Sequence, residues 1–396
     1  MKEKIMILGA GRGQVDLIQT AKSMGYETVV ASIKGDYPGF EIADEICYAD
    51  ISDPEEIANA AARYKVGGIA TACLDTGIAA LGYACEKNGL TGLSEAAARY
   101  SGNKYLMKKS FQKKNVNSAK YKKVNSLEEA MCVIKELQFP LIVKAVDLQG
   151  SRGINIVSNP EELISGYKSS MQETRENYCI IEEYIEGYKF GATAFIYNKK
   201  VLFVLPTGDI TYLGNTKIPI GHYIPLGLDE EIFDKVEKEV SLAISAVQLD
   251  NCAVDVDLIL KDGEVYVIEI TGRLGANCLP QLTSIYLGVN IYNLVVETAM
   301  GHDPSHYIKK QNENNGCGYA KMLISTKNGI LTNIINNNAE SSDIVDISFF
   351  VKPGDRIKKF TNAKDCIGQI VVKGRNVETC KKRIQEVEDK IIFEME

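Results

Sequence analysis

The first hundred residues alternate short apolar segments with helical patterns, and this alternation constrains the fold more than any other feature. Apolar runs of strand length separated by helices predict a doubly wound parallel sheet, because parallel neighbours need a crossover connection. Asp53 followed by Pro54 is typical of a helix start, since aspartate caps the first turn and proline fits the first helical position. The predicted strands lie at 5–8, 28–31 and 68–71, and the predicted helices at 15–21, from 53 onward and at 76–87.

The pattern changes near residue 100, where the strict alternation stops. Further along, four strand-like runs surround a predicted helix at 229–248 and favour an antiparallel sheet. These runs lie at 191–197, 201–205, 253–260 and 264–270, and the segment 317–396 mixes short strands with a helix near 376–390. The sequence therefore predicts a mixed α/β and α+β protein with domains at 1–100, 101–308 and 309–396.

Composition excludes several classes of protein. The 396 residues carry 45 Lys and Arg against 52 Asp and Glu, and this net charge of −7 argues against a protein that binds nucleic-acid backbones. Ten cysteines without a CxxC pair and only three histidines indicate reduced thiols and no zinc site. No uninterrupted apolar stretch approaches 18 residues, so no membrane span is expected. We expect a cytoplasmic protein that acts on small molecules, with a homodimer as the default assembly.

The segment Gly9-Ala10-Gly11-Arg12-Gly13-Gln14 partly matches the dinucleotide-binding fingerprint. Gln14 stands where the fingerprint has glycine or alanine, and Ser32-Ile33 stands where an acid would hold the ribose. The favoured interpretation is a tight turn between strand and helix. A nicotinamide-dependent oxidoreductase remains the alternative.

The middle of the chain carries a candidate phosphate loop. Lys144 ends an apolar strand and is followed by Asp147-Leu148-Gln149-Gly150-Ser151-Arg152-Gly153. A glycine-bearing loop lets backbone N–H groups approach phosphate oxygens, and Lys144 and Arg152 would add positive charge. The alternative is a hairpin turn with solvated basic residues.

Two acidic strands form a candidate metal site. Asp255 and Asp257 share one face of a strand, and a turn near 262–263 brings the returning strand back so that Asp257 and Glu269 lie almost opposite each other. Opposed carboxylates repel, and Mg²⁺ between them would remove the repulsion while leaving room for phosphate and water ligands. The alternatives are solvent exposure of one carboxylate or pairing of each with a lysine.

Arg273 follows four residues after Glu269. An arginine beside a metal–phosphate site can stabilise a transferring phosphoryl group, whereas the alternative is a surface arginine in a glycine-rich turn. The other lysines between 104 and 123 are interpreted as a solvated helix face.

Taken together, these motifs resemble the ATP-grasp superfamily of ligases, in its carboxylate–amine and amino-acid ligase branch, with relatives of carbamoyl-phosphate-synthase and biotin-carboxylase type. The resemblance implies a Rossmann-like domain before a central ATP-grasp fold, whose hinge spans 181–187, and a small closing domain at the C-terminus. It implies Lys144 and Arg273 as catalytic residues, Asp257 and Glu269 as metal ligands, and Arg273 and His222 near the acceptor substrate. The implied ATP-binding residues are Lys104, Lys144, Gly150, Ser151, Arg152, Gly153, Glu182, Glu183 and Ile185.

Two positions depart from the family pattern. Thr271 stands where an asparagine commonly follows the second metal ligand, and Lys189 stands where a glutamate often holds the ribose hydroxyls. These departures affect the expected metal geometry and ribose contact.

The resemblance implies an ADP-forming ligase that makes a C–N bond through an acylphosphate, using ATP with Mg²⁺, or with Mn²⁺ as an alternative ion. The carboxylate and amine would be amino acids or small acids. The alternatives are a bicarbonate-using enzyme of the carboxylase or carbamoyl-phosphate type and a non-catalytic ATP-binding module.

Overall fold

The computed structural model describes residues 2–148, 152–212, 218–308 and 316–396. Its contacts divide the chain into two compact units, each built from three segments. The first unit contains 1–204, 228–273 and 295–303, and the second contains 205–227, 274–294 and 304–396. The three domains expected from the sequence, at 1–100, 101–308 and 309–396, stay a prediction.

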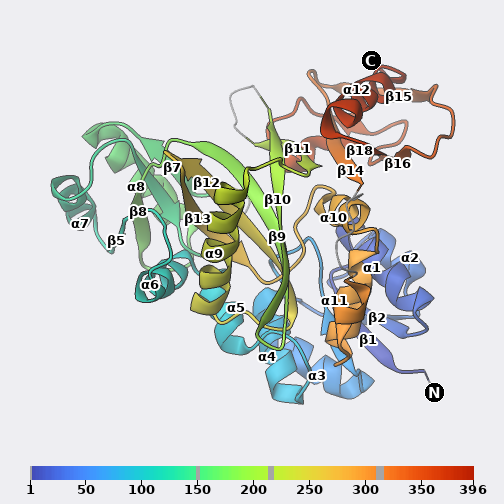
Figure 1. Cartoon of the computed structure of the whole chain (residues 1–396), viewed down its shortest axis with the longest axis horizontal. Helices are drawn as coiled ribbons and strands as arrows, with labels where there is room; N and C mark the ends of the chain where they lie inside the picture. The colour runs from blue at the N-terminus through green and yellow to red at the C-terminus, as the bar shows by residue number, and fades with distance from the viewer. Residues whose placement is uncertain (1, 149–151, 213–217, 309–315) are drawn as a thin grey trace. The chain divides into compact units, whose positions relative to one another are not determined.

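The first unit begins with the expected parallel sheet (Figure 1). Its strand order is β3-β2-β1-β4, and every neighbouring pair is parallel. Ile5, Met6 and Leu8 on β1 are fully buried, as a central strand covered on both faces requires. The elements are β1 (Lys4–Leu8), α1 (Arg12–Ser23), β2 (Glu27–Ser32), α2 (Pro38–Ile42), β3 (Glu45–Tyr48), α3 (Pro54–Tyr64), β4 (Gly68–Ala70), α4 (Ile78–Asn88) and α5 (Glu95–Gly102).

The glycine-rich turn between β1 and α1 is filled by the protein itself. Gly9 has φ +95°, and a Cβ added to Gly13 would lie 2.8 Å from the Cβ of Cys73. The Gln14 side chain donates a hydrogen bond of 2.6 Å to the Ala72 carbonyl. The glycines therefore permit close packing of this turn on the segment after β4, which supports the tight-turn interpretation.

A second, antiparallel sheet follows in the same unit, with strand order β5-β8-β6-β7. Val143 on β6 and Ile181 on β8 are fully buried in its core, beneath α8. The elements are α6 (Lys104–Lys114), β5 (Tyr121–Val124), α7 (Leu127–Cys132), a 3₁₀ turn η1 (Val133–Lys135), β6 (Leu141–Ala145), β7 (Ile154–Val157), α8 (Pro160–Glu173) and β8 (Cys179–Glu183).

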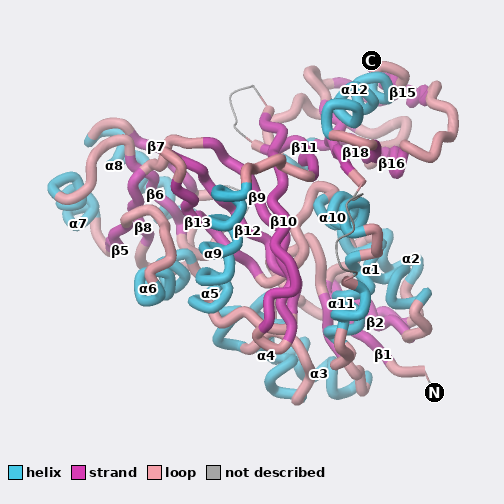
Figure 2. The backbone as a smooth tube through the Cα atoms, in the orientation of Figure 1, coloured by secondary structure: helices cyan, strands magenta, loops and turns pink. Residues whose placement is uncertain are grey.

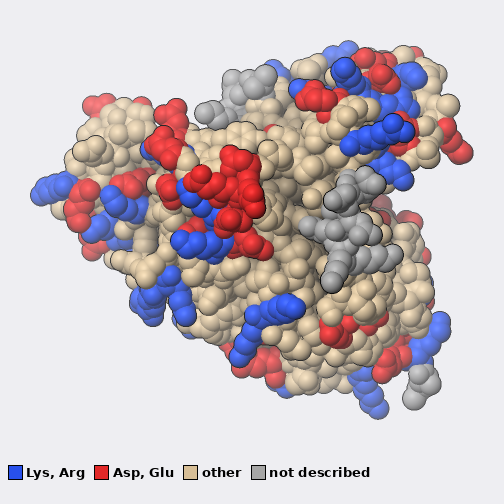
Figure 3. Space-filling model, in the orientation of Figure 1, with Lys and Arg blue, Asp and Glu red and all other residues tan. Residues whose placement is uncertain are grey.

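Four long strands have the order β13-β12-β9-β10 (Figure 2), and β10 runs from the first unit into the second. They are β9 (Tyr188–Tyr197), β10 (Lys200–Thr211), β12 (Cys252–Lys261) and β13 (Glu264–Thr271), with α9 (Glu230–Ala246) packed against β13. Figure 3 shows acidic side chains gathered over α9, whose first half contains Glu230, Glu231, Asp234 and Glu237. The negative charge of the chain is therefore unevenly distributed.

The second unit has a sheet of order β11-β14-β18-β16, which begins beside the end of β10, and a three-stranded sheet β17-β15-β19. Helix α12 packs against β14 and β18, and Ile370, Val372 and Val387 are fully buried between them. Helix α11 (Ile291–Ala299) begins in this unit and continues into the first. The other elements are β11 (Pro219–Ile224), α10 (Leu279–Leu287), η2 (Pro304–Tyr307), β14 (Cys317–Ile324), β15 (Gly329–Asn336), β16 (Ile344–Phe349), β17 (Arg356–Ile357), η3 (Ala363–Asp365), β18 (Cys366–Gly374), α12 (Val377–Glu388) and β19 (Ile391–Met395).

Among the described residues, no helix combines the length and apolar character that crossing a membrane requires.

Candidate active site

The hairpin of β12 and β13 places Asp257 directly opposite Glu269. From the turn, Lys261 pairs with Glu264 and the pairing runs regularly to Leu258 and Val267. A register shift then leaves one extra residue on β13, so that Asp257 meets Glu269 instead of Ile268. β-bulges of this kind re-aim side chains beside active sites. The expected opposition of the two carboxylates is therefore present, and the bulge produces it.

Lys104 links this pair to the candidate phosphate loop. Its Nζ donates to Glu269 Oε1 at 2.8 Å and to the Leu148 carbonyl at 2.7 Å. The Lys104 side chain is 9% exposed, whereas Asp257 lies on the exposed face of β12. A cation thus already neutralises Glu269, and Asp257 faces the solvent side.

The donor set fits a hard divalent cation held between protein and phosphate. The described residues contain no group of three or more His, Cys, Asp or Glu that would hold a metal alone. Two opposed carboxylates with a neighbouring lysine match Mg²⁺, which takes one or two carboxylates and completes its shell with phosphate oxygens and water. Asp257 and Glu269 would hold that ion. Thr271 pairs with Asp255, two residue pairs further along the hairpin.

The first unit also contains a buried cluster of three charged residues, Lys144, Glu182 and Lys108. Lys144 Nζ donates to Glu182 Oε2 at 2.9 Å, and Lys108 Nζ forms an ion pair with the same oxygen at 3.5 Å. Burial alone would raise the pKa of Glu182, but the two lysines lower it below its usual value. Burial lowers the pKa of Lys108, an effect that Glu182 partly offsets.

The expectation for Lys108 was wrong. The sequence analysis placed it on a solvated helix face, but its side chain is only 1% exposed. Lys108 lies one helical turn after Lys104 on α6, so both point to the same side of the helix. Lys109, Lys113 and Lys114 are exposed, as expected.

The loop after β6 connects two strands of an antiparallel hairpin. Gly150 and Ser151, expected to contact phosphate, lie outside the described residues, whereas Arg152 is described and exposed. Gly153 has φ +62°, and a Cβ there would lie 2.6 Å from that of Ala145. Its carbonyl accepts hydrogen bonds from the Ala145 N–H at 2.9 Å and the Ser170 hydroxyl at 3.0 Å. The end of the loop is therefore fixed, and glycine is required there.

The expected hinge, 181–187, begins within β8. The N–H groups of Glu183 and Tyr184 donate to the carbonyls of Lys120 and Pro140 at 3.0 and 3.1 Å. Ile185 is buried in a small apolar cluster with Ala119 and Ile259. An adenine at this hinge would therefore rest on an apolar surface and bind backbone groups other than those two N–H donors.

Arg273 is held between two carboxylates. Its Nε donates to Asp75 Oδ1 at 2.7 Å, and its Nη1 forms an ion pair with Asp255. Burial by itself would lower the pKa of Arg273, but Asp255 and Asp75 more than offset this effect and raise it. Arg273 is therefore a fixed positive charge rather than a loose surface residue.

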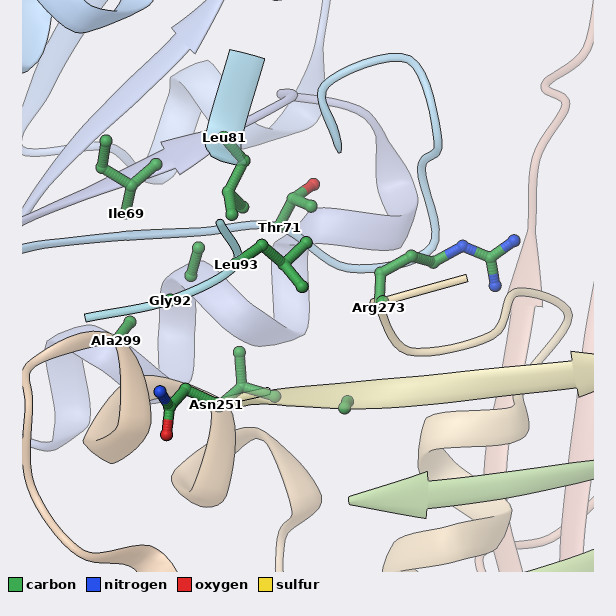
Figure 4. A pocket seen from close by; sticks show the side chains of 12 residues that line it. Ile69, Thr71, Leu81, Gly92, Leu93, Asn251, Arg273 and Ala299 are labelled. Carbon is green, nitrogen blue, oxygen red and sulfur yellow. The ribbon is translucent and has the colours of Figure 1, made fainter. Parts of the chain in front are cut away.

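A small cavity of about 40 Å³ lies at the base of Arg273 (Figure 4). Its lining is mainly apolar and includes Ile69, Leu93 and Ala299. In Figure 4 the Arg273 side chain extends away from Leu93 and Thr71. The cavity has room for about one water, whose share of liquid volume is about 30 Å³, and none for a substrate.

His222 lies in the second unit, on β11. Its Nδ1 is 2.9 Å from Asp209 Oδ1 on the paired strand β10, and its side chain is 9% exposed. A carboxylate on Nδ1 favours the tautomer whose Nε2 accepts hydrogen bonds. His222 is thus oriented by a neighbour, and its expected role near the acceptor stays a prediction.

Sequence reasoning missed two residues of this site, Lys108 and Asp75. The four-residue spacing from Lys104 was a usable signal for Lys108. Asp75 follows β4 at the carboxyl end of a parallel strand, where ligand-binding groups gather in open α/β sheets. Its partner, however, lies 198 residues further along the chain.

Comparison with protein families gives two matches. Residues 102–345, more than half of the chain, match the family described as phosphoribosylglycinamide synthetase, ATP-grasp (A) domain. Residues 321–396 match L-amino acid ligase C-terminal domain 2.

Individual relatives agree with these matches. The structure of a phosphoribosylglycinamide synthetase from Anaerococcus prevotii is 44% identical, with a TM-score of 0.88 over 100% of both chains. An L-amino acid ligase from Bacillus licheniformis is 18% identical over 100% of this chain and 99% of that one, with a TM-score of 0.85, and thus shares the fold. An alanine–anticapsin ligase from Bacillus subtilis is 28% identical over 65% of this chain, which spans 60% of that relative's length.

Proposed function

Because the chain belongs to the phosphoribosylglycinamide synthetase ATP-grasp (A) domain family, we propose that it is an ATP-dependent, ADP-forming ligase that joins a carboxylate to an amine. One observation carries this proposal: Asp257 and Glu269 oppose each other on β12 and β13, with Lys104 bonded to Glu269 and to the phosphate-loop segment. Phosphoryl transfer requires carboxylates that can hold a cation and a lysine that lies next to the phosphate loop, and both are present here.

The reaction needs positioning and charge neutralisation. A carboxylate oxygen attacks the γ-phosphorus of ATP, the bond to the ADP oxygen breaks, and an acylphosphate forms. The amine nitrogen then attacks the acyl carbon, phosphate leaves with its electron pair, and the nitrogen gives up a proton. Asp257 and Glu269 would hold Mg²⁺, whose charge would neutralise that of the phosphates.

The residues of this chain divide these tasks. Lys104 and Lys144 supply positive charge next to the loop that ends at Gly153. Arg273, whose guanidinium is held by Asp75 and Asp255, stabilises the transferring group and orients the carboxylate. Glu182, Glu183 and Ile185 border the base.

We propose that an amino acid provides the carboxylate. The names of the relatives support this class, since glycinamide is an amide of the amino acid glycine and the other two names contain alanine and L-amino acid. The match of 321–396 to an L-amino acid ligase domain supports the same substrate class.

A phosphate-release screen tests the proposal. The protein is incubated with ATP, Mg²⁺ and pairs of amino acids, starting from glycine and alanine, and ADP, AMP and phosphate are measured. ADP and phosphate should appear only with a carboxylate–amine pair, and Asp257→Asn should weaken the signal at limiting Mg²⁺. AMP formation, or stimulation by bicarbonate alone, would contradict a carboxylate–amine ligase.

A further inference from the structure

The buried cluster of Lys108, Lys144 and Glu182 contains two lysines but only one carboxylate. Both lysines approach a single oxygen, Glu182 Oε2, and their side chains are 1% and 6% exposed. Among the described residues, Lys108 Nζ makes no hydrogen bond, and Glu182 Oε1 accepts none. Two buried lysines thus share one carboxylate oxygen.

A buried lysine without a hydrogen bond needs an explanation, because an apolar side chain of similar volume avoids the desolvation penalty. Lys144 alone would neutralise Glu182, since their hydrogen bond of 2.9 Å is short and direct. Lys108 is therefore redundant as long as Lys144 stays on Glu182.

The redundancy ends if Lys144 leaves. Under the proposed function, Lys144 binds a phosphate oxygen of the nucleotide, and we expect its Nζ to shift from Glu182 toward that ligand. Glu182 is 1% exposed, and an unpaired carboxylate at this depth would be strongly unfavourable. Lys108, at 3.5 Å from the same oxygen, remains in place as a second cation.

We propose that Lys108 is a positioning residue that acts as the reserve counter-ion of Glu182 and so frees Lys144 to bind nucleotide phosphate. The inference rests on the proposed function, because it assumes a nucleotide at this site. It assigns Lys108 no contact with the ligand and no role in the chemical step.

A double-mutant cycle tests this role, with MgADP binding measured by titration calorimetry. Lys108→Met should weaken MgADP binding by about tenfold or more, because Lys144 can then leave Glu182 only by exposing a buried, unpaired carboxylate. In the Glu182→Gln background the same substitution should weaken binding by less than about twofold, since a neutral side chain needs no counter-ion.

Three further variants complete the test. Lys108→Arg keeps the charge and should bind MgADP within about threefold of the wild type, and Lys109→Met, on the exposed face of α6, should bind normally. Lys108→Gln is the second neutral variant if Lys108→Met does not fold, and thermal melts identify folded proteins.

An equal loss in both backgrounds would overturn the proposal, because Lys108 would then act directly on the charge of the ligand. Normal binding by a folded Lys108→Met, or weak binding by Lys108→Arg, would also overturn it. A wild-type protein that binds no MgADP would overturn the nucleotide site and hence both proposals. A wild type that binds MgADP but joins no substrates would overturn the ligase proposal alone.

Discussion

Arg273 meets two carboxylates, Asp75 and Asp255, before any substrate arrives. This pairing fixes the guanidinium, and a fixed charge stabilises a transition state without reorganising. Arg273→Ala should lower kcat for phosphate release by about 10²–10³-fold, the effect of removing one preorganised donor. MgADP affinity should change by less than about threefold, since the proposed role of Arg273 is in transfer.

Arg99→Ala is the matched control, because Arg99 is exposed in the last turn of α5. Arg273→Lys retains the charge without the planar fork and should recover only part of the rate. Wild-type turnover by a folded Arg273→Ala would remove Arg273 from the mechanism.

Asp257 and Glu269 are predicted to determine the Mg²⁺ requirement. Substituting groups that only support a metal ligand weakens metal affinity about 10–100-fold, so replacing a ligand itself should do at least as much. Asp257→Asn and Glu269→Gln should therefore raise the Mg²⁺ concentration for half-maximal phosphate release by about tenfold or more.

The control for the metal prediction is Glu264→Gln, at the turn of the same hairpin, where the side chain pairs with Lys235. It should leave the Mg²⁺ dependence unchanged. If Asp257→Asn and Glu269→Gln show the same Mg²⁺ dependence as this control, the metal site lies elsewhere.

Two residues show why residue-level prediction was incomplete. Lysine is usually found at the surface, and the packing of α6 against neighbouring elements buries Lys108. No sequence pattern indicates that Asp75 pairs with Arg273, because the contact forms only in the tertiary structure. Asp257 on its strand and Lys144 at the end of an apolar run were predictable because strand periodicity fixes their positions.

At the scale of elements, the β12–β13 hairpin was largely predictable. Asp262 and Gly263 both have positive φ, 51° and 77°, as the two-residue turn between Lys261 and Glu264 requires. Regular pairing from that turn would place Ile268 opposite Asp257. The bulge places Glu269 there instead of Ile268. It depends on local packing, and the sequence indicates it less clearly than it indicates the turn.

Helix starts were also predictable, and α3 offers a test. The Asp53 carboxylate accepts a hydrogen bond of 3.0 Å from the Glu56 N–H, which confirms the expected cap. Asp53→Ala should destabilise α3 by about 1 kcal/mol, so its first-turn amides should exchange hydrogen about fivefold faster.

Asn59→Ala provides the comparison for the cap, because Asn59 is an exposed residue within the same helix and makes no contribution to its end. Exchange in that variant should match the wild type or slow slightly, since alanine favours helix. Equal exchange in both variants would show that the cap contributes nothing measurable.

For the whole molecule, the succession of a parallel sheet, an antiparallel core and a C-terminal mixed region was predictable from periodicity. The compact units were not, because each combines segments that are distant in the chain. Residues 205–227 and 274–294, for example, belong to the second unit although they interrupt the first. Contacts between segments that are distant in the chain leave no local pattern in the sequence.

The ten cysteines give a prediction for the whole chain. All ten are free thiols, and Cys132 alone is exposed. Burial raises the pKa of Cys85 and of Cys179 to about 12, so at pH 8 only about 10⁻⁴ of each is thiolate, the reactive form. Native protein should therefore react rapidly with a thiol reagent at about one site.

Cys132→Ser should remove that fast phase, and unfolding should release the remaining thiols. Because the thiolate fraction of a raised-pKa thiol grows tenfold per pH unit below its pKa, the slow reactions should accelerate as pH rises. A fast phase that persists in Cys132→Ser would contradict the exposure pattern.

The interleaved segments also affect how the chain is made. The chain passes between the two units five times, and the last segment of the first unit is 295–303. A ribosome that adds about 5–20 residues per second reaches Arg273 roughly 10–40 s after it has made Asp75. During that interval the sheet of β1–β4 must stay able to fold correctly although Arg273, the partner of Asp75, has not yet been made. Completion of the first unit is delayed until most of the protein has been translated.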